Sequence, residues 1–194
     1  MADRRAEILD TALHVIAEHG MRGLTHRAVD ASAGLPQGST SYYFRTRDAL
    51  VTGCLHRLLE LDAADIPAAP PPRDLGTMVE LVARLCVDML STGEFRTMAR
   101  YELSLHAARS PTLRSQLVEA GSTLRRLGAA QLGALGVRHP VPATEEIMAM
   151  IDGLVFTALI RGPREHAALL EWFRGPLHRL LSTHLELPNT EAAR

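Results

Sequence analysis

The fold of this chain is decided by residues 24–50, which read LTHRAVDASAGLPQGSTSYYFRTRDAL. The hydroxyl of Thr25 can cap a short helix that runs to about Ala33, because a side-chain oxygen at this position accepts from a first-turn amide. Gly34 then permits the positive φ that a sharp exit demands. A further short helix follows from Gln37 to Tyr43. The stretch therefore predicts two short helices joined by a tight turn.

The second of these short helices is rich in small polar residues. Gly38, Ser39, Thr40 and Ser41 are poor helix formers, so packing or contact with a partner must justify them. Glutamine can pair with adenine, hydroxyl groups can bond to several bases, and tyrosines can donate to phosphate oxygens. The alternative interpretation is that Tyr42, Tyr43 and Phe44 are only core aromatics and that the hydroxyl groups only form a solvated face. An exposed polar helix, however, has little structural purpose without a partner. The pattern favours a helix-turn-helix that reads the major groove.

Helical periodicity extends on both sides of this motif. Apolar residues recur at helical spacing from Arg4 to His19, and Gly20 follows as a cap. A long helix is expected from Arg47 to Ala64, before a stiff linker at Pro67–Pro72. No segment alternates apolar and polar residues, so we predict an all-α protein. Further helices are expected at roughly 74–92, 94–108, 111–135, 143–162 and 165–186, the last with a kink at Gly175-Pro176.

Composition narrows the class of protein. The net charge is -1, and arginines barely outnumber acids in the first part of the chain, so a basic footprint does not by itself indicate DNA. Cys54 and Cys86 lie far apart in helical patterns and are interpreted as small buried hydrophobes. No run approaches the ~18 apolar residues of a membrane span. We expect a cytoplasmic bacterial protein without a cofactor.

Residues 20–50 resemble the signature of the tetracycline-repressor (TetR) family over some thirty positions at fixed spacing. The resemblance implies a three-helix DNA-binding head at 1–46 and a helical ligand-binding and dimerisation body at 47–194. Two heads of a homodimer would then read a palindromic operator in double-stranded DNA. Pro36, Thr40 and Ser41 depart from the serine, leucine and tyrosine common in the family. The residues expected to bind DNA are Thr25, Arg27, Gln37, Gly38, Ser39, Thr40, Ser41, Tyr42, Tyr43 and Arg47.

The same resemblance implies a small-molecule pocket and a subunit interface in the body. Pocket candidates combine apolar lining with hydrogen-bonding groups, although ordinary core or surface positions are the alternative for each: Cys86, Met89, Met98, Tyr101, Glu102, Leu105, His106 and Phe156. The last two helices carry more apolar surface than one small body needs, which favours an interface over burial within the monomer. Its candidates are Ile147, Ile151, Leu154, Val155, Ala158, Leu170, Phe173, Leu177 and Leu181.

The predicted function is therefore a DNA-binding transcriptional regulator. We expect a repressor that a small apolar or amphipathic effector releases from its operator; the alternative is an architectural or partner-controlled regulator without a sensor. The sequence contains no nucleophile elbow, phosphate-binding glycine loop, H-E-x-x-H pair or dinucleotide glycines, which argues against an enzyme. No two histidines stand three or four residues apart, so a helical metal site made of histidines is not expected.

Overall fold

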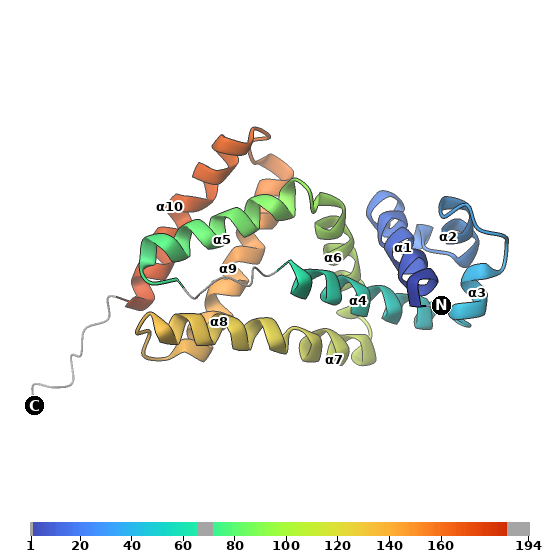
Figure 1. Cartoon of the computed structure of the whole chain (residues 1–194), viewed down its shortest axis with the longest axis horizontal. Helices are drawn as coiled ribbons and strands as arrows, with labels where there is room; N and C mark the ends of the chain where they lie inside the picture. The colour runs from blue at the N-terminus through green and yellow to red at the C-terminus, as the bar shows by residue number, and fades with distance from the viewer. Residues whose placement is uncertain (1, 66–71, 186–194) are drawn as a thin grey trace, which may run out of the picture. The chain divides into compact units, whose positions relative to one another are not determined.

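A computed structural model describes residues 2–65 and 72–185 of the chain. No strand occurs within these ranges, and the all-α prediction is confirmed. The predicted linker lies, apart from Pro72, outside the described residues. The helices are α1 (Ala2–Gly23), α2 (His26–Ser32), α3 (Ser39–Tyr43), α4 (Arg47–Ala64), α5 (Leu75–Leu90), α6 (Glu94–Ala107), α7 (Pro111–Ala120), α8 (Ser122–Ala134), α9 (Pro140–Arg161) and α10 (His166–Leu185) (Figure 1).

These helices form two compact units. The first unit joins residues 1–67 to residues 93–122, and thus contains α1 to α4 together with α6 and α7. The second unit joins residues 68–92 to residues 123–194, and contains α5, α8, α9 and α10. A division into residues 1–46 and 47–194 would separate α4 and α6 from α1, on which both pack. The first unit is therefore larger than the three-helix head expected from sequence.

The core of the first unit is built around the apolar face of α1. Ile8, Ala12 and Ile16 follow one another at helical spacing and are fully buried. They belong to one cluster with apolar residues of α4 and α6, including Leu50 and Leu103. Apolar residues of the helix-turn-helix belong to the same cluster, so α4 and α6 share one hydrophobic core with it.

The first helix ends as its sequence predicts and then resumes briefly. Gly20 has a φ of 65°, in the left-handed region that favours glycine, so the regular part of the helix stops there. The chain continues in helical conformation to Gly23, which the sequence pattern did not predict. The backbone of Met21 thereby lies at a break in the helix, where its polar groups need partners from elsewhere.

Two helix boundaries in the later part of the chain differ from the prediction. The helix predicted at 111–135 is interrupted at Gly121, the C-cap of α7, and the division between the two units falls immediately afterwards. The helix predicted from 143 begins earlier, at Pro140, because proline has the right φ and needs no hydrogen-bond donor in a first helical turn.

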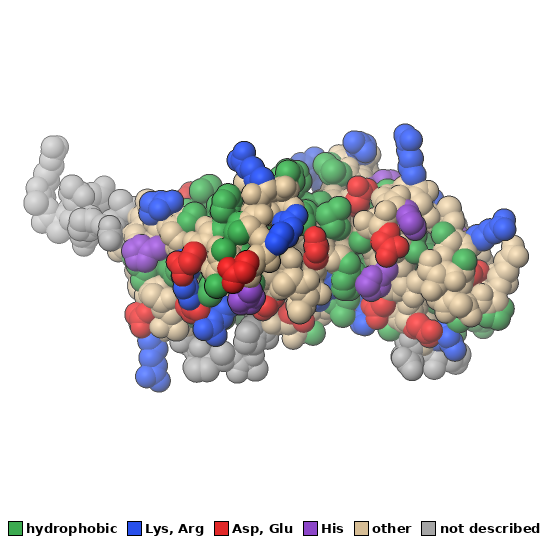
Figure 2. Space-filling view, turned by 90° about the horizontal axis from the view of Figure 1, so that it is seen from above, with side chains coloured by type: hydrophobic (Ala, Val, Ile, Leu, Met, Phe, Trp, Pro, Cys, Tyr) green, Lys and Arg blue, Asp and Glu red, His purple; other side chains and the backbone are tan. Residues whose placement is uncertain are grey.

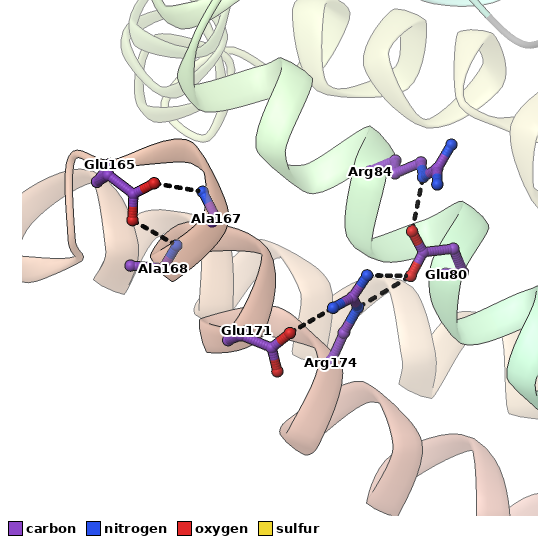
Figure 3. Close-up of polar contacts among 7 residues, drawn as sticks. All are labelled: Glu80, Arg84, Glu165, Ala167, Ala168, Glu171 and Arg174. Carbon is purple, nitrogen blue, oxygen red and sulfur yellow. Dashed lines mark hydrogen bonds and ion pairs between the residues drawn. The ribbon is translucent and has the colours of Figure 1, made fainter.

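The second unit is tied together by ion pairs as well as by its core. Arg174 of α10 donates to Glu80 of α5, with 2.9 Å between Arg174 Nε and Glu80 Oε2, and also contacts Glu171 (Figure 3). Arg84 donates to the other oxygen of Glu80 at 2.7 Å. At the start of α10, the carboxylate of Glu165 accepts from the amides of Ala167 and Ala168. The Arg174–Glu80 pair thus joins α10 to α5, whereas the bonds to Glu165 cap the start of α10.

Burial in the second unit corrects most of the predicted subunit interface. Six of its nine residues pack in the core of their own chain, where no partner can reach them: Ile147, Val155, Ala158, Phe173, Leu177 and Leu181. Ile151, Leu154 and Leu170 are half-buried. The sequence pattern identified apolar faces correctly, but a large apolar face serves equally well to close a monomer.

Candidate nucleic-acid interface

The helix-turn-helix begins with the cap that the sequence predicts. Thr25 is extended, and its Oγ1 accepts from the amide of Ala28 at 3.1 Å. After α2 the chain turns at Gly34, which has a φ of 64°. The amide of Leu35 then donates to the carbonyl oxygen of Asp30 at 2.8 Å, which closes the turn. The local geometry thus follows from Thr25 and Gly34, as expected.

The start of α3 is held by a carboxylate that sequence reasoning did not single out. Asp30 of α2 is only 3% exposed, and its Oδ2 accepts from the amide of Gly38 at 2.7 Å. Its Oδ1 accepts from both the amide and the hydroxyl of Thr40, at 2.8 and 2.6 Å. Burial tends to raise the pKa of Asp30, but the hydrogen bonds from Thr40 and Gly38 outweigh it and hold this pKa below its ordinary value.

The end of α3 is held by the same helix. Nε2 of His26 lies 2.6 Å from the carbonyl oxygen of Phe44, the C-cap of α3. Because a carbonyl oxygen only accepts, the imidazole must carry its proton on Nε2 to make this bond. The side chain of Phe44 is itself buried in the core of the first unit. Both ends of α3 are therefore attached to α2.

Most of the predicted DNA-binding residues lie at the surface. Thr25, Arg27, Gln37, Gly38, Tyr42 and Arg47 are exposed, and Ser39, Ser41 and Tyr43 are half-buried. Tyr43 packs against the core of the first unit, and the hydroxyl of Ser39 donates to the carbonyl oxygen of Pro36 at 2.6 Å.

The structure corrects the prediction for Thr40. Its side chain has no exposed surface, and its hydroxyl is used on Asp30, so it cannot present a group to a base. The side chains that remain accessible are those of Ser41 and Tyr42 on α3 and of Gln37 in the turn just before it.

Two arginines flank this face, and one of them was missed by sequence reasoning. Arg45 lies with its guanidinium carbon 6.0 Å from the centre of the Tyr42 ring, and Tyr42 is 67% exposed. A tyrosine hydroxyl beside a guanidinium suits a phosphate, because both groups can donate hydrogen bonds to its oxygens. Arg47, at the start of α4, donates to the carbonyl oxygen of Met21 at 2.5 Å. In the free protein, the hydrogen-bond acceptor of the Arg47 guanidinium is thus a backbone group of the same chain.

The wider surface matches the weak net charge. On the face shown in Figure 2, arginine side chains project singly and acidic side chains lie among them. A nucleic-acid interface on this face would therefore depend on how particular residues are placed, and less on a continuous basic surface.

Two family models match the chain. Residues 8–54 match the model described as bacterial regulatory proteins of the tetR family, and residues 73–182 match that of the tetracyclin repressor-like C-terminal domain. The chain belongs to the TetR family. It is a transcriptional regulator with a helix-turn-helix that binds DNA, as its sequence predicts.

Individual TetR relatives support the assignment over nearly the whole chain. The HTH-type transcriptional regulator BetI of Burkholderia thailandensis is 31% identical over 176 residues, which cover 87% of this chain and 88% of the relative. The multidrug binding protein EbrR, solved with ethidium, is 31% identical, covers 91% of this chain and 98% of its own, and has a TM-score of 0.70. A TetR family member from Streptomyces coelicolor A3 is 30% identical, with coverages of 91% and 97% and a TM-score of 0.71.

The predicted pocket residues divide between the two units. Cys86, Met89 and Phe156 belong to the second unit, whereas Met98, Tyr101, Glu102, Leu105 and His106 belong to α6 in the first unit. Leu105 and Phe156 are exposed, and the carboxylate of Glu102 accepts from the amide of Met21. A single pocket lined by all eight residues stays a prediction.

Both cysteines are buried, which confirms their interpretation as small hydrophobes. Burial raises the pKa of the Cys54 and Cys86 thiols to about 12, so both remain protonated and unreactive near neutral pH.

Within the described ranges, the helices are too short or too polar to cross a lipid bilayer.

Proposed function

We propose that the protein is a homodimeric repressor that binds a palindromic operator and is released from it by a small apolar or amphipathic effector. The observation that carries the proposal is the polar, accessible face of α3 beside Arg45 and Arg47. In a helix-turn-helix this face enters the major groove, while residues at its ends grip phosphates. Control of a bacterial promoter also requires a cytoplasmic location.

Distinct contributions follow from the chemistry of each exposed side chain. The amide of Gln37 can pair bidentately with an adenine edge, which gives sequence preference. Tyr42 and Arg45 can donate to the phosphate backbone, as can Arg27 at the start of α2, and such contacts add affinity on every sequence. Arg47 would exchange its bond to Met21 for a phosphate on binding.

The class of effector is supported by a relative. EbrR, at 31% identity, is a multidrug binding protein solved with ethidium, a flat cationic aromatic molecule. The same protein was solved with proflavin and with malachite green, which are also cationic aromatic molecules. We carry this class over to the present chain, in which an effector would shift the population of dimers away from the geometry that fits DNA.

The surface proposed for dimerisation is the exposed apolar face of α9. Met150, Phe156 and Ile160 are 51%, 47% and 65% exposed, and Gly153 lies among them at helical spacing. Exposed apolar residues gathered on one helix face are typical of a subunit interface. They replace, in this proposal, the six buried residues for which sequence periodicity had indicated an interface.

Release by an effector can be tested on the protein bound to an operator selected from random DNA. Fluorescence anisotropy of the labelled operator would follow binding while malachite green is titrated in. This dye is chosen because it need not compete with the protein for DNA by intercalation. We expect the operator to dissociate and the thermal midpoint of the DNA-free protein to rise. Tighter DNA binding on addition of the dye would contradict the repressor, and indifference to a panel of such molecules would favour a regulator controlled by a partner.

A further inference from the structure

Helix α2 contacts the recognition helix α3 at both of its ends through polar side chains. Asp30 accepts from the amides of Gly38 and Thr40 at the start of α3, and His26 donates to the carbonyl oxygen of Phe44 at its end. Because His26 and Asp30 are four residues apart, they lie on the same face of α2, which is the face turned toward α3.

The recognition helix needs such support because its own sequence supplies little. It has five residues, Ser39 to Tyr43, and its N-cap is Gly38, which has no side chain to cap the free amides. A helix of this length is marginal without tertiary contacts. Asp30 replaces the missing cap from eight and ten residues earlier in the chain.

The charges of the two ends match this arrangement. A helix start carries partial positive charge and its end partial negative charge. A carboxylate at the start of α3 and an imidazole N–H at its end are therefore both favourable. Asp30 also accepts the Thr40 hydroxyl, and its own carbonyl accepts from Leu35 in the turn. One residue thus fixes the turn and the first turn of α3 together.

We propose that Asp30 and His26 are positioning residues that clamp α3 at two points and thereby set the sequence preference of the protein for its operator. The inference rests on the proposed function, since it needs an operator to be read. Neither residue touches DNA in this account. They determine the direction in which the base-reading side chains of Gln37 and Ser41 point.

A clamp of this kind differs from a contribution to stability alone. If it only stabilised the first unit, its loss would weaken binding to every DNA sequence together with folding. If it orients α3, its loss tilts the base-reading side chains and leaves phosphate contacts largely in place. The ratio of affinities for the operator and for an unrelated duplex then falls, because only the operator rewards correct orientation.

The test measures this ratio by fluorescence anisotropy for the full-length protein and its variants, with the operator selected by the unaltered protein. We expect Asp30→Ala to lower the ratio about 10- to 100-fold, since the start of α3 then loses its attachment to α2 and the buried amide of Thr40 loses its acceptor. His26→Ala should lower it about 10-fold, whereas His26→Gln, whose amide can donate to Phe44, should stay within about threefold. Ser32→Ala, at the exposed end of α2, is the matched control and should change nothing.

A double variant separates orientation from stability. In Asp30→Ala/Thr40→Leu an apolar side chain fills the buried space, so the thermal midpoint should recover relative to Asp30→Ala while the lowered ratio persists. The clamp is overturned if the ratio of Asp30→Ala stays within about twofold of the unaltered protein, or if the double variant regains both the midpoint and the ratio. Failure of the proposed function would be visible earlier, because the unaltered protein would then select no operator.

Discussion

The carboxylate of Glu102 on α6 accepts a hydrogen bond from the backbone amide of Met21, with 3.2 Å between Met21 N and Glu102 Oε2. The carbonyl oxygen of Met21 accepts a hydrogen bond from Arg47 of α4. Met21 follows the left-handed Gly20, where the regular part of α1 ends. The end of α1 is therefore held by α4 and α6 together, which links the helix-turn-helix to a helix far along the chain within the first unit.

This link predicts a loss of stability when the acceptor is removed. Glu102→Ala should lower the free energy of unfolding by about 1–2 kcal/mol, since the bond joins a charged acceptor to a half-buried amide. Glu102→Gln retains an acceptor oxygen and should lose less. Urea unfolding followed by circular dichroism measures both, with Glu119→Ala on the exposed side of α7 as control. An unchanged midpoint for Glu102→Ala would show that the contact contributes nothing.

The two kinds of DNA contact should separate in mutational data. Gln37→Ala should relax the sequence preference, because it removes a base-reading amide and leaves the phosphate contacts intact. Equal losses on all DNA sequences would contradict the assignment of Gln37.

Phosphate contacts should respond differently. Tyr42→Phe, Arg45→Ala and Arg47→Ala should weaken binding almost equally on every sequence, and each arginine variant should reduce the salt slope by about one counterion. Arg45 is the cleaner test, since Arg47 also bonds to Met21 in the free protein. A salt titration on the operator and on an unrelated duplex gives both slopes; an Arg45→Ala slope equal to that of the unaltered protein would remove Arg45 from the interface.

The proposed subunit interface makes a prediction for α9. Ile160→Glu places a charge in the exposed apolar face and should convert the dimer to a folded monomer with weak operator binding. Val141→Glu is the matched control, because Val141 is 60% exposed on α9 but lies in its first turn, at the opposite end of the helix from Ile160. Sedimentation equilibrium distinguishes the species, and an intact Ile160→Glu dimer would place the interface elsewhere.

The Glu80 network predicts how the second unit responds to acid. Hydrogen bonds from Arg84 and Arg174 hold the pKa of Glu80 below its ordinary value of 4.5. The contribution of this carboxylate is then fully present above that value and is lost as the pH falls through the lowered pKa. Unfolding experiments should show a stability difference between the unaltered protein and Glu80→Gln that is constant above about pH 5 and shrinks in stronger acid. A difference that grows on acidification would have the wrong sign for this network.

Local signals explain what the sequence could predict. The cap at Thr25, the positive φ at Gly20 and Gly34, and the helical periodicity all act over a few residues, so they can be recognised in the chain itself. The fold class and the position of the helix-turn-helix follow from them. The match of residues 20–50 to one family then gives the function class.

Contacts between distant residues explain what it could not. Asp30 looks like an ordinary exposed helix residue until the turn brings Gly38 and Thr40 to it, and Thr40 is buried for the same reason. Apolar periodicity in α10 shows that Phe173 and Leu177 are buried, but not whether their own chain or a partner covers them. The signal that could have indicated the clamp is the pair Asp30 and Thr40. These two polar side chains meet in the interior, where two apolar side chains would otherwise pack.

Selection of bound sequences from a random double-stranded DNA library by the purified protein tests the central claim most directly. The account predicts enrichment of a palindrome whose half-site centres lie about one helical turn, or a multiple of it, apart. A weaker enrichment for Gln37→Ala would assign the sequence preference to the helix-turn-helix. Recovery of no preferred sequence by the folded protein would contradict a sequence-specific regulator.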